Sequence, residues 1–550
     1  MDLREVDRVE GVPLLDAEES ANALEPMAIS DHDEKTWKPA INRYYQLLRI
    51  PEWNLKPPQF RPRWDPEHAK QAYDLALRFI VFFIPSFLRR NPESDKELHE
   101  TAYLDGLRGY ACYAVFFSHH FTAYCFEVWH PFGEGGNLHF VQTHYFFQLP
   151  IFRMLFNGQA AITVFFVLSG YVLSYKPLKL IYAHDFEKLQ GCLASSIFRR
   201  WWRLFLPVAA LWIINVFLVE FGAFSWFDAF RVDNPGMPPG IIETYLTRGE
   251  SFWGTAYNAY TSFIEYARYT VFKWTNIGFL PEVDGHTWTL HIEFRSSCIL
   301  FLFLHGTSAM QPNLRLGFSL LSVAACLYWD EWAIATFLVG SAIADLDLRM
   351  RRRQVRKSST NEGSDFDSLP VTDTPSKMPF LRNLFLSQYD QFLWGLLFIA
   401  SLVLLSYPTV GADKVFFYSF LSYWHPSAAW DLFFWLSIGA MILVFVAGRL
   451  RILQRILEWR FSQYIGKTSF ALYLVHGTVI KSLGHFVVIK CWKHITGYKG
   501  WGYAGGIVLP LLLVVGPVTI IASDWFWRGI DKPSVRFGRW LENLVRDRNI

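Results

Sequence analysis

Neither sign of charge is in excess in this chain of 550 residues, which contains 52 lysines and arginines and 49 acidic residues. A nucleic-acid-binding protein would show a basic stripe with base-reading elements, and the sequence has neither. We therefore expect no nucleic-acid partner. Hydrophobic residues make up 52% of the chain, which excludes a disordered or a collagen-like protein.

Cysteine is scarce too, and the sequence lacks Cys-x-x-Cys pairs and Cys/His runs with the spacing of zinc ligands. Most cysteines lie in apolar stretches, where they behave as small hydrophobic residues. We expect neither a disulfide framework nor a metal site. No apolar segment follows a basic N-terminus, so no cleavable secretory signal is predicted. An internal repeat of the kind that many transporters contain is also missing.

What the sequence does contain is long apolar stretches, which recur through most of the chain. They approach the length of about 20 residues that crosses a hydrocarbon core, whereas helices of soluble domains rarely stay apolar all round for that length. We therefore predict an all-α fold, a polytopic membrane helical bundle with about ten transmembrane helices. The predicted spans lie near 106–126, 156–175, 202–221, 287–304, 315–329, 332–345, 391–408, 430–448, 464–483 and 505–525.

Basic residues indicate how this bundle is oriented. With the N-terminus in the cytosol, the cytosolic connections hold the basic runs of 176–200, 349–357, 449–455 and the C-terminal tail. A short lysine cluster at 490–499 is the one discordant group. We predict a multi-pass integral membrane protein with cytosolic termini, in the endoplasmic reticulum or another endomembrane.

Three regions flank or interrupt the predicted bundle. Residues 1–100 are interpreted as a cytosolic N-terminal arm, in which the short apolar segment 73–90 predicts an interfacial helix. Residues 351–378 are rich in Ser, Thr, Asp and Pro and predict a disordered cytosolic loop. Residues 531–550 are predicted to form a cytosolic C-terminal tail.

Ionisable residues inside a membrane span are costly, so each is a functional hypothesis by default. Arg108 and His119 are eleven residues apart in the first predicted span, which puts them within about 20° of each other on a helix. His119 then lies about 16 Å above Arg108, near the midplane, where a neutral imidazole suits a proton acceptor. The alternative is a hydrogen-bonded structural histidine. His120 points about 100° away and is interpreted as a packing or lipid-side residue.

Other polar groups are expected inside the bundle. His476 lies about twelve residues into the ninth predicted span and again reaches the midplane. Glu293 and Arg295 lie on nearly opposite faces of an apolar helix, so each needs a partner on another helix. A structural charge network and a catalytic role are about equally compatible with this pair. Ser169, followed by Gly170, places a hydroxyl where helices approach closely, as in ordinary packing.

Arg199, Arg200 and Arg203 cluster at the cytosolic end of the third predicted span. Such a cluster is typical of the positive-inside signal of any membrane protein. It also suits a phosphate clamp, because guanidinium groups match phosphate oxygens and Arg200 and Arg203 share a helix face. Position alone favours neither interpretation.

Five segments read, in this order, YLDGLRGYACYAVFFSHH, FFVLSGYVLSY, FRRWWRLFLP, TWTLHIEFRSS and YIGKTSFALYLVHG. Their order and spacing resemble the signature blocks of the acyltransferase family 3 integral-membrane acyltransferases, and most closely their fungal branch. The resemblance covers residues 101–530, which it marks as the transmembrane domain. His291 and Ser296 depart from the usual Pro and Gly of the fourth block, which bears on local helix geometry but leaves Glu293 in place.

The resemblance implies transfer of an acyl group, usually acetyl, from a cytosolic acyl-CoA to a hydroxyl. The family's Arg-x10-His, Ser-Gly and Arg-x-x-Arg motifs fall on Arg108 and His119, on Ser169 and Gly170, and on Arg200 and Arg203. Acyl-CoA is then a co-substrate rather than a tightly bound cofactor.

Family and physical chemistry together suggest a division of roles. His119 is expected to act as general base on the acceptor hydroxyl, and His476, Glu293 or Ser169 to orient it or to stabilise developing charge. The phosphates of acyl-CoA are expected to bind Arg108, Arg199, Arg200 and Arg203.

The sequence is compatible with either a glycan or a small metabolite as the hydroxyl acceptor. The aromatic-rich helices favour a lipophilic molecule. The lipid bilayer is the other expected partner. A proton-coupled transporter that uses the midplane His and Glu residues is the alternative function. A catalytically silent receptor or scaffold is a third.

Overall fold

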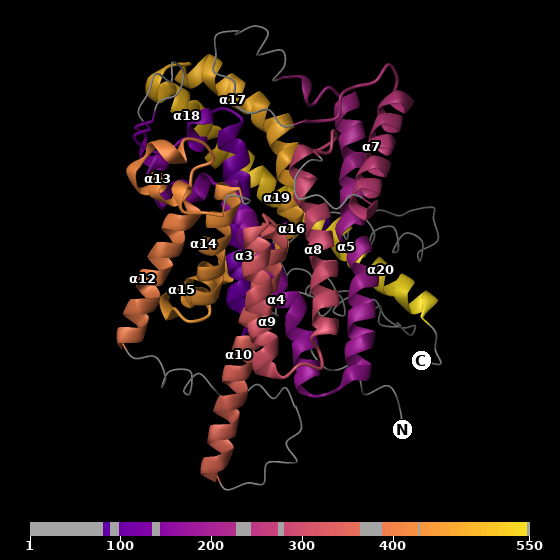
Figure 1. Ribbon diagram of the computed structural model, residues 1–550. Helices are drawn as coiled ribbons and strands as arrows, with labels where there is room; N and C mark the ends of the chain where they lie inside the picture. Colours follow the sequence, from indigo (N-terminus) through magenta and orange to yellow (C-terminus); the bar gives the residue numbers. More distant parts are fainter. Residues whose placement is uncertain are drawn as a thin grey trace, which may run out of the picture.

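The structure of this chain is a computed structural model, which describes residues 81–88, 98–134, 143–226, 244–272, 280–362, 388–426 and 430–546. Within these ranges the chain is helical, and one isolated β-bridge joins Tyr245 to Asp284. Figure 1 shows long helices side by side in a bundle, with α17 and α18 at one end and the end of α10 at the other. The all-α prediction is confirmed for the described residues.

Six helices pack on one another to form the part of the bundle that holds the site. They are α3 (Ala102–Thr122), α4 (Gly158–Tyr182), α5 (Phe186–Glu220), α8 (Trp288–Gly306), α10 (Trp332–Glu362) and α16 (Arg460–Val479). Around them lie α7 (Phe252–Phe272), α9 (Pro312–Tyr328), α12 (Gln388–Leu405), α13 (Phe416–Tyr423), α14 (Asp431–Ala447) and α15 (Arg451–Leu457). The chain ends in α17 (His485–Cys491), α18 (Gly500–Pro510), α19 (Gly516–Phe526) and α20 (Lys532–Val545).

Short helical turns connect these helices. The 3₁₀ turns of the described chain are η3 (Ser86–Leu88), η5 (Phe126–Trp129), η6 (Phe146–Gln148), η7 (Phe152–Phe156), η8 (Gly285–Thr287) and η10 (Ala412–Lys414). The π turns are η11 (Ile480–Gly484), η12 (Trp492–Thr496), η13 (Leu511–Val515) and η14 (Trp527–Asp531). Because the π turns join helices without a break, the last two helical segments of the chain run from Arg460 to Thr496 and from Gly500 to Val545.

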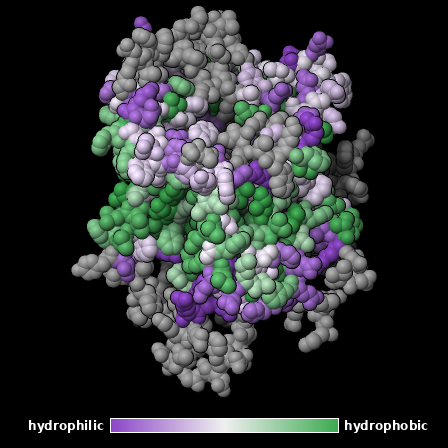
Figure 2. Space-filling view, in the orientation of Figure 1, coloured by the Kyte–Doolittle hydropathy of each residue, from purple (hydrophilic) through white to green (hydrophobic). Residues whose placement is uncertain are grey.

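A helix occupies each of the ten predicted spans, but fewer helices meet the requirements for crossing a membrane. Four described segments are long and apolar enough, namely Gly158–Tyr182, Phe186–Glu220, Arg460–Thr496 and Gly500–Val545. A bent pair, α14 with α15, adds a fifth if it is one span. Figure 2 shows hydrophobic residues gathered in a band across the middle of the molecule, with hydrophilic residues above and below it. These features are those of a membrane protein, and the number of ten crossings stays a prediction.

The structure differs from the sequence prediction at several boundaries. Helix α10 continues to Glu362, into the predicted loop of 351–378, because the basic run after its apolar part keeps helix-forming residues. The rest of that loop lies outside the described residues, as does most of the N-terminal arm. Helix α7 was not among the predicted elements. Part of the predicted C-terminal tail is α20, a helix that packs on α5.

Glycines bring the central helices into close contact. A Cβ on Gly170 would lie 2.1 Å from the carbonyl oxygen of Phe337, so α4 and α10 touch at their backbones. A Cβ on Gly466 would lie 2.4 Å from the carbonyl oxygen of Asp105, and α3 and α16 therefore touch in the same way. Such small-residue contacts are the usual basis of helix packing in membranes. The packing interpretation of Gly170 is confirmed, and the polar residues of α3 and α16 come to face each other.

Candidate active site

A cavity of about 120 Å³ lies between α3, α4, α5, α8 and α16. Most of its wall is apolar, with side chains such as Phe165, Leu173 and Phe470. The polar part of the wall consists of Arg108, Ser169, Arg200, Arg203, Thr289, Glu293, Ser469 and Tyr473. The cavity therefore brings together five residues to which the sequence analysis assigns roles: Arg108, Ser169, Arg200, Arg203 and Glu293.

Glu293 is bound to an arginine within this cavity. Arg200 donates to its carboxylate at 2.8 Å, and Ser169 donates to the same oxygen at 3.5 Å. Arg200 also donates to Ser297 at 3.1 Å. The prediction that Glu293 needs a partner on another helix is confirmed, and that partner is a guanidinium group rather than a histidine.

Arg199 and Arg108 have different surroundings. The Nε of Arg199 lies 3.1 Å from a carboxylate oxygen of Glu542 in α20, and Arg199 does not line the cavity. Arg108 lines the cavity, donates to the carbonyl of Gly466 and lies 3.3 Å from Asp105. The structure thus places Arg108, but not Arg199, with Arg200 and Arg203.

His119 lies in a second group of polar residues, which we call the histidine cluster and which comprises His119, His286 and His476. The ring centroids are 5.1 Å apart for His119 and His476, 6.0 Å for His119 and His286, and 4.4 Å for His286 and His476. The three side chains come from α3, η8 and α16. His286 and His476 are buried, and His119 is half-buried. The predicted proximity of His119 and His476 is therefore present in the structure.

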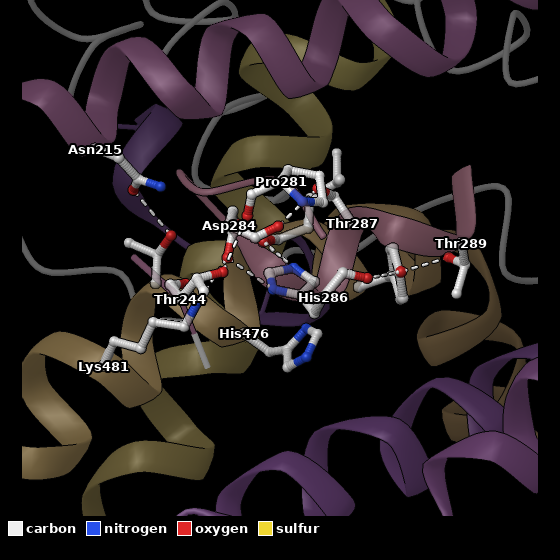
Figure 3. Close-up of polar contacts among 12 residues, drawn as sticks. Asn215, Thr244, Pro281, Asp284, His286, Thr287, Thr289, His476 and Lys481 are labelled. Atoms are coloured by element: carbon white, nitrogen blue, oxygen red, sulfur yellow. Dashed lines mark hydrogen bonds and ion pairs between the residues drawn. The ribbon is translucent and has the colours of Figure 1, made fainter. Parts of the chain in front are cut away.

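Two charged residues complete the surroundings of His286, as Figure 3 shows. Asp284 lies 2.8 Å from Nδ1 of His286 and accepts a hydrogen bond from Lys481 at 2.7 Å. Burial alone would raise the pKa of Asp284, but His286 and Lys481 outweigh burial and leave that pKa below its usual value. This carboxylate is therefore held in its charged form.

The sequence analysis missed His286, Asp284 and Lys481. It considered neither Asp284, in the connection before the fourth block, nor His286, directly before that block, as a site residue. One signal was available: Lys481 is an ionisable residue within the predicted span 464–483, and such a residue needs a buried counter-ion.

Tyr473 and Thr289 join the cavity to the histidine cluster. Both line the cavity, and their hydroxyl oxygens are 2.5 Å apart. Tyr473 also donates to the backbone carbonyl of His286, and its ring centroid lies 5.9 Å from that of His476. None of the three histidines is among the cavity-lining residues. The histidine cluster thus lies directly behind one wall of the cavity.

The remaining polar residues of these helices have structural partners. Arg295 donates to Glu331, which precedes α10, so the expected partner on another segment is present. His120 is buried, and its Nε2 lies 3.1 Å from the carbonyl oxygen of Ile507 in α18. This contact agrees with the packing role predicted for His120.

Comparisons with known proteins cover most of the chain. The O-acetyltransferase PaAT-1 of Phomopsis amygdali is 30% identical over 477 residues, which make up 84% of this chain and 88% of that protein. The acyltransferase R4 of a Phoma species is 24% identical over 498 residues, or 81% of this chain and 96% of that protein. The acyltransferase clz18 of Cochliobolus lunatus is 25% identical over 426 residues, or 70% and 83%.

No solved structure matches the chain at a significant level. The family model of the acyltransferase domain matches residues 101–528, a range that contains the cavity and the whole histidine cluster. On this match and on the similarity to the fungal enzymes, the chain belongs to acyltransferase family 3.

Proposed function

We propose that this acyltransferase moves an acyl group, most often acetyl, from acyl-CoA to a hydroxyl of a small lipophilic metabolite or a glycan. The observation on which the proposal rests is the position of His119. His119 shares a face of α3 with Arg108, which lines the cavity. It also contacts His476, and His476 lies one helical turn from Tyr473, another residue that lines the cavity. One helix pair thus presents groups for binding an anion and groups for moving a proton.

In this proposal the phosphates of acyl-CoA bind Arg108, Arg200 and Arg203 from the cytosolic side. The apolar wall accommodates the pantetheine arm and the acyl chain, and it favours a lipophilic acceptor. Because Tyr473 and Thr289 form the wall next to the histidine cluster, the thioester approaches His119 past these two residues.

The reaction is then a direct transfer. His119 takes the proton of the acceptor hydroxyl, and the acceptor oxygen bonds to the thioester carbonyl carbon. The carbon–sulfur bond breaks, and the CoA thiolate leaves and takes up the proton from His119. His476 is close enough to orient His119 or to share its proton. Glu293 remains with Arg200 and supports the binding site rather than the proton transfer.

The test begins with the gene deleted, because the alcohol that accumulates without its ester identifies the acceptor. The purified full chain is then incubated with acetyl-CoA and this alcohol, and release of CoA and formation of the ester are measured. His119→Ala should lower kcat about 10²- to 10⁴-fold, the usual contribution of a positioned general base.

His305→Ala is the matched control, since His305 is an exposed histidine at the end of α8, outside both the cavity and the histidine cluster. It should retain full activity. A fully active His119→Ala variant would refute the assignment. Solute transport without release of CoA would refute the enzyme and favour the transporter.

A further inference from the structure

The charges next to His286 are buried to an extent that packing alone does not require. Asp284 is 1% exposed and Lys481 is 5% exposed. Lys481 donates to Asp284 at 2.7 Å and to the carbonyl of Thr244 at 3.1 Å. Removing a carboxylate and an ammonium group from water is costly, and a hydrophobic pair of similar volume is often at least as stable. Such a pair therefore indicates a role beyond stability.

Two local irregularities of the chain create this arrangement. The π turn η11 follows α16 and contains Lys481, and π turns inside helices occur frequently at functional sites. Gly477 provides the second, because a Cβ at this position would lie 2.4 Å from Cε1 of His286. The absence of a side chain at Gly477 thus lets the imidazole of His286 lie against α16, next to His476.

Contacts on both edges fix the ring of His286. Nδ1 of His286 lies 2.8 Å from the Asp284 carboxylate, and its Nε2 lies 3.2 Å from the carbonyl oxygen of Leu474. Nδ1 of His476 lies 3.1 Å from the carbonyl oxygen of Leu472, so the neighbouring ring is fixed as well.

We propose that Asp284 and Lys481 are positioning residues that hold the ring of His286 against His476 and His119, so that the three imidazoles keep the arrangement that proton transfer requires. The physical reason is that Lys481 fixes the carboxylate of Asp284, which lies 2.8 Å from Nδ1 of His286, while the ring centroids of the cluster stay 4.4 to 6.0 Å apart. The groups that face His286 are Asp284, Lys481 of η11, Tyr473 and His476 of α16, and His119 of α3. This inference rests on the proposed function of His119 as the base.

Two variants of the full chain test the proposal. His286→Gln removes the imidazole ring and leaves the ion pair of Asp284 and Lys481 in place. Asp284→Asn combined with Lys481→Met removes both charges of that pair and leaves no buried charge without its partner. Each should lower kcat about 10- to 100-fold, as expected for the loss of groups that orient a functional histidine. The KM for acetyl-CoA should change by less than about twofold, because the cavity arginines are untouched.

The split between kcat and KM gives the readout that a merely structural role would not move, because a general loss of packing would also disturb the neighbouring cavity. Acetyl-CoA with the accumulated alcohol is the assay, and CoA release from acetyl-CoA with water as acceptor is a second one. Lys481→Arg, which keeps the charge, should retain the wild-type kcat.

Wild-type kcat in both variants would overturn the proposal, and so would a rise in the KM for acetyl-CoA as large as the fall in kcat. These outcomes differ from failure of the proposed function itself. An inactive His119→Ala variant next to a fully active His286→Gln variant refutes only this inference. An active His119→Ala variant refutes the base on which it rests.

Discussion

The arginine-lined cavity and the histidine cluster share α3 and α16 but are built in different ways. In the cavity, the charged groups lie on helices and one carboxylate, Glu293, already pairs with Arg200 at 2.8 Å. In the histidine cluster, Asp284 and His286 come from a connection and from η8, and they meet α16 only where Gly477 and a π turn make room. The cavity is thus a charged binding surface, whereas the cluster is an arrangement of proton donors and acceptors.

This difference leads to a simple expectation about kinetics. Substitutions in the cavity should mainly change the KM for acyl-CoA, because they alter contacts that ground state and transition state share. Substitutions in the histidine cluster should mainly change kcat, because proton transfer occurs only during the reaction. If substitutions in the cavity mainly lowered kcat, or substitutions in the histidine cluster mainly raised the KM, this distinction between the two regions would be wrong.

After His119, the largest effect is expected in the histidine cluster at His476. His476→Ala removes the ring 5.1 Å from that of His119 and should lower kcat about 10²-fold or more, with little change in the KM for acetyl-CoA. The measurement is steady-state kinetics with the purified protein. His494→Ala is the control, since His494 is an exposed histidine of η12, and it should be as active as the wild type. An unchanged kcat for His476→Ala would place His476 outside the reaction.

The next effect concerns the cavity. Replacing Arg200 and Arg203 together by Ala should raise the KM for acetyl-CoA about 100-fold or more, because each charge-assisted hydrogen bond to phosphate contributes about 1.5–3 kcal/mol. The KM for the acceptor should change less. Arg199→Ala is the control, because it removes one neighbouring positive charge that pairs with Glu542 outside the cavity. Equal effects of both changes would mean that charge near this face of the membrane, rather than a clamp, attracts acyl-CoA.

Helical periodicity could predict the part of the site that lies within single helices. The eleven-residue separation of Arg108 and His119 places both on one face of α3, and in the structure both contact α16, through Gly466 and His476. The apolar stretches likewise predicted where the main helices lie. Both predictions depend on local geometry, which is the same for any α-helix of this composition.

Contacts between distant segments could not be predicted in this way. Arg199 and Arg200 are neighbours in sequence with the same local signal, and only the packing of α20 on α5 directs Arg199 to Glu542. Asp284 lies in a polar connection, and nothing near it in the sequence indicates that a π turn brings Lys481 within 2.7 Å. A helical pattern has no information about which distant residue meets which face.

A smaller effect is expected at Glu293, and it distinguishes a role in binding acyl-CoA from a role in the chemical step. If Glu293 only neutralises Arg200, Glu293→Gln should free this arginine for phosphate and lower the KM for acetyl-CoA about two- to fivefold. The value of kcat should stay within about twofold of the wild type. Kinetics at several acetyl-CoA concentrations measures both values. A kcat lowered about a hundredfold would instead assign Glu293 to the chemical step, and the proposed division between cavity and histidine cluster would fail.

A similarly small effect is expected at Tyr473, which belongs to both regions. Tyr473→Phe keeps the ring that lines the cavity but removes the hydroxyl that bonds to Thr289 and to the carbonyl of His286. Losing such a hydrogen bond costs about 0.5–1.5 kcal/mol, so we expect kcat to fall about two- to tenfold. The KM for acetyl-CoA should be unchanged, because the apolar wall is intact. If the KM rises while kcat is constant, Tyr473 belongs to the binding surface alone, and the cavity and the histidine cluster are less closely coupled than their shared wall indicates.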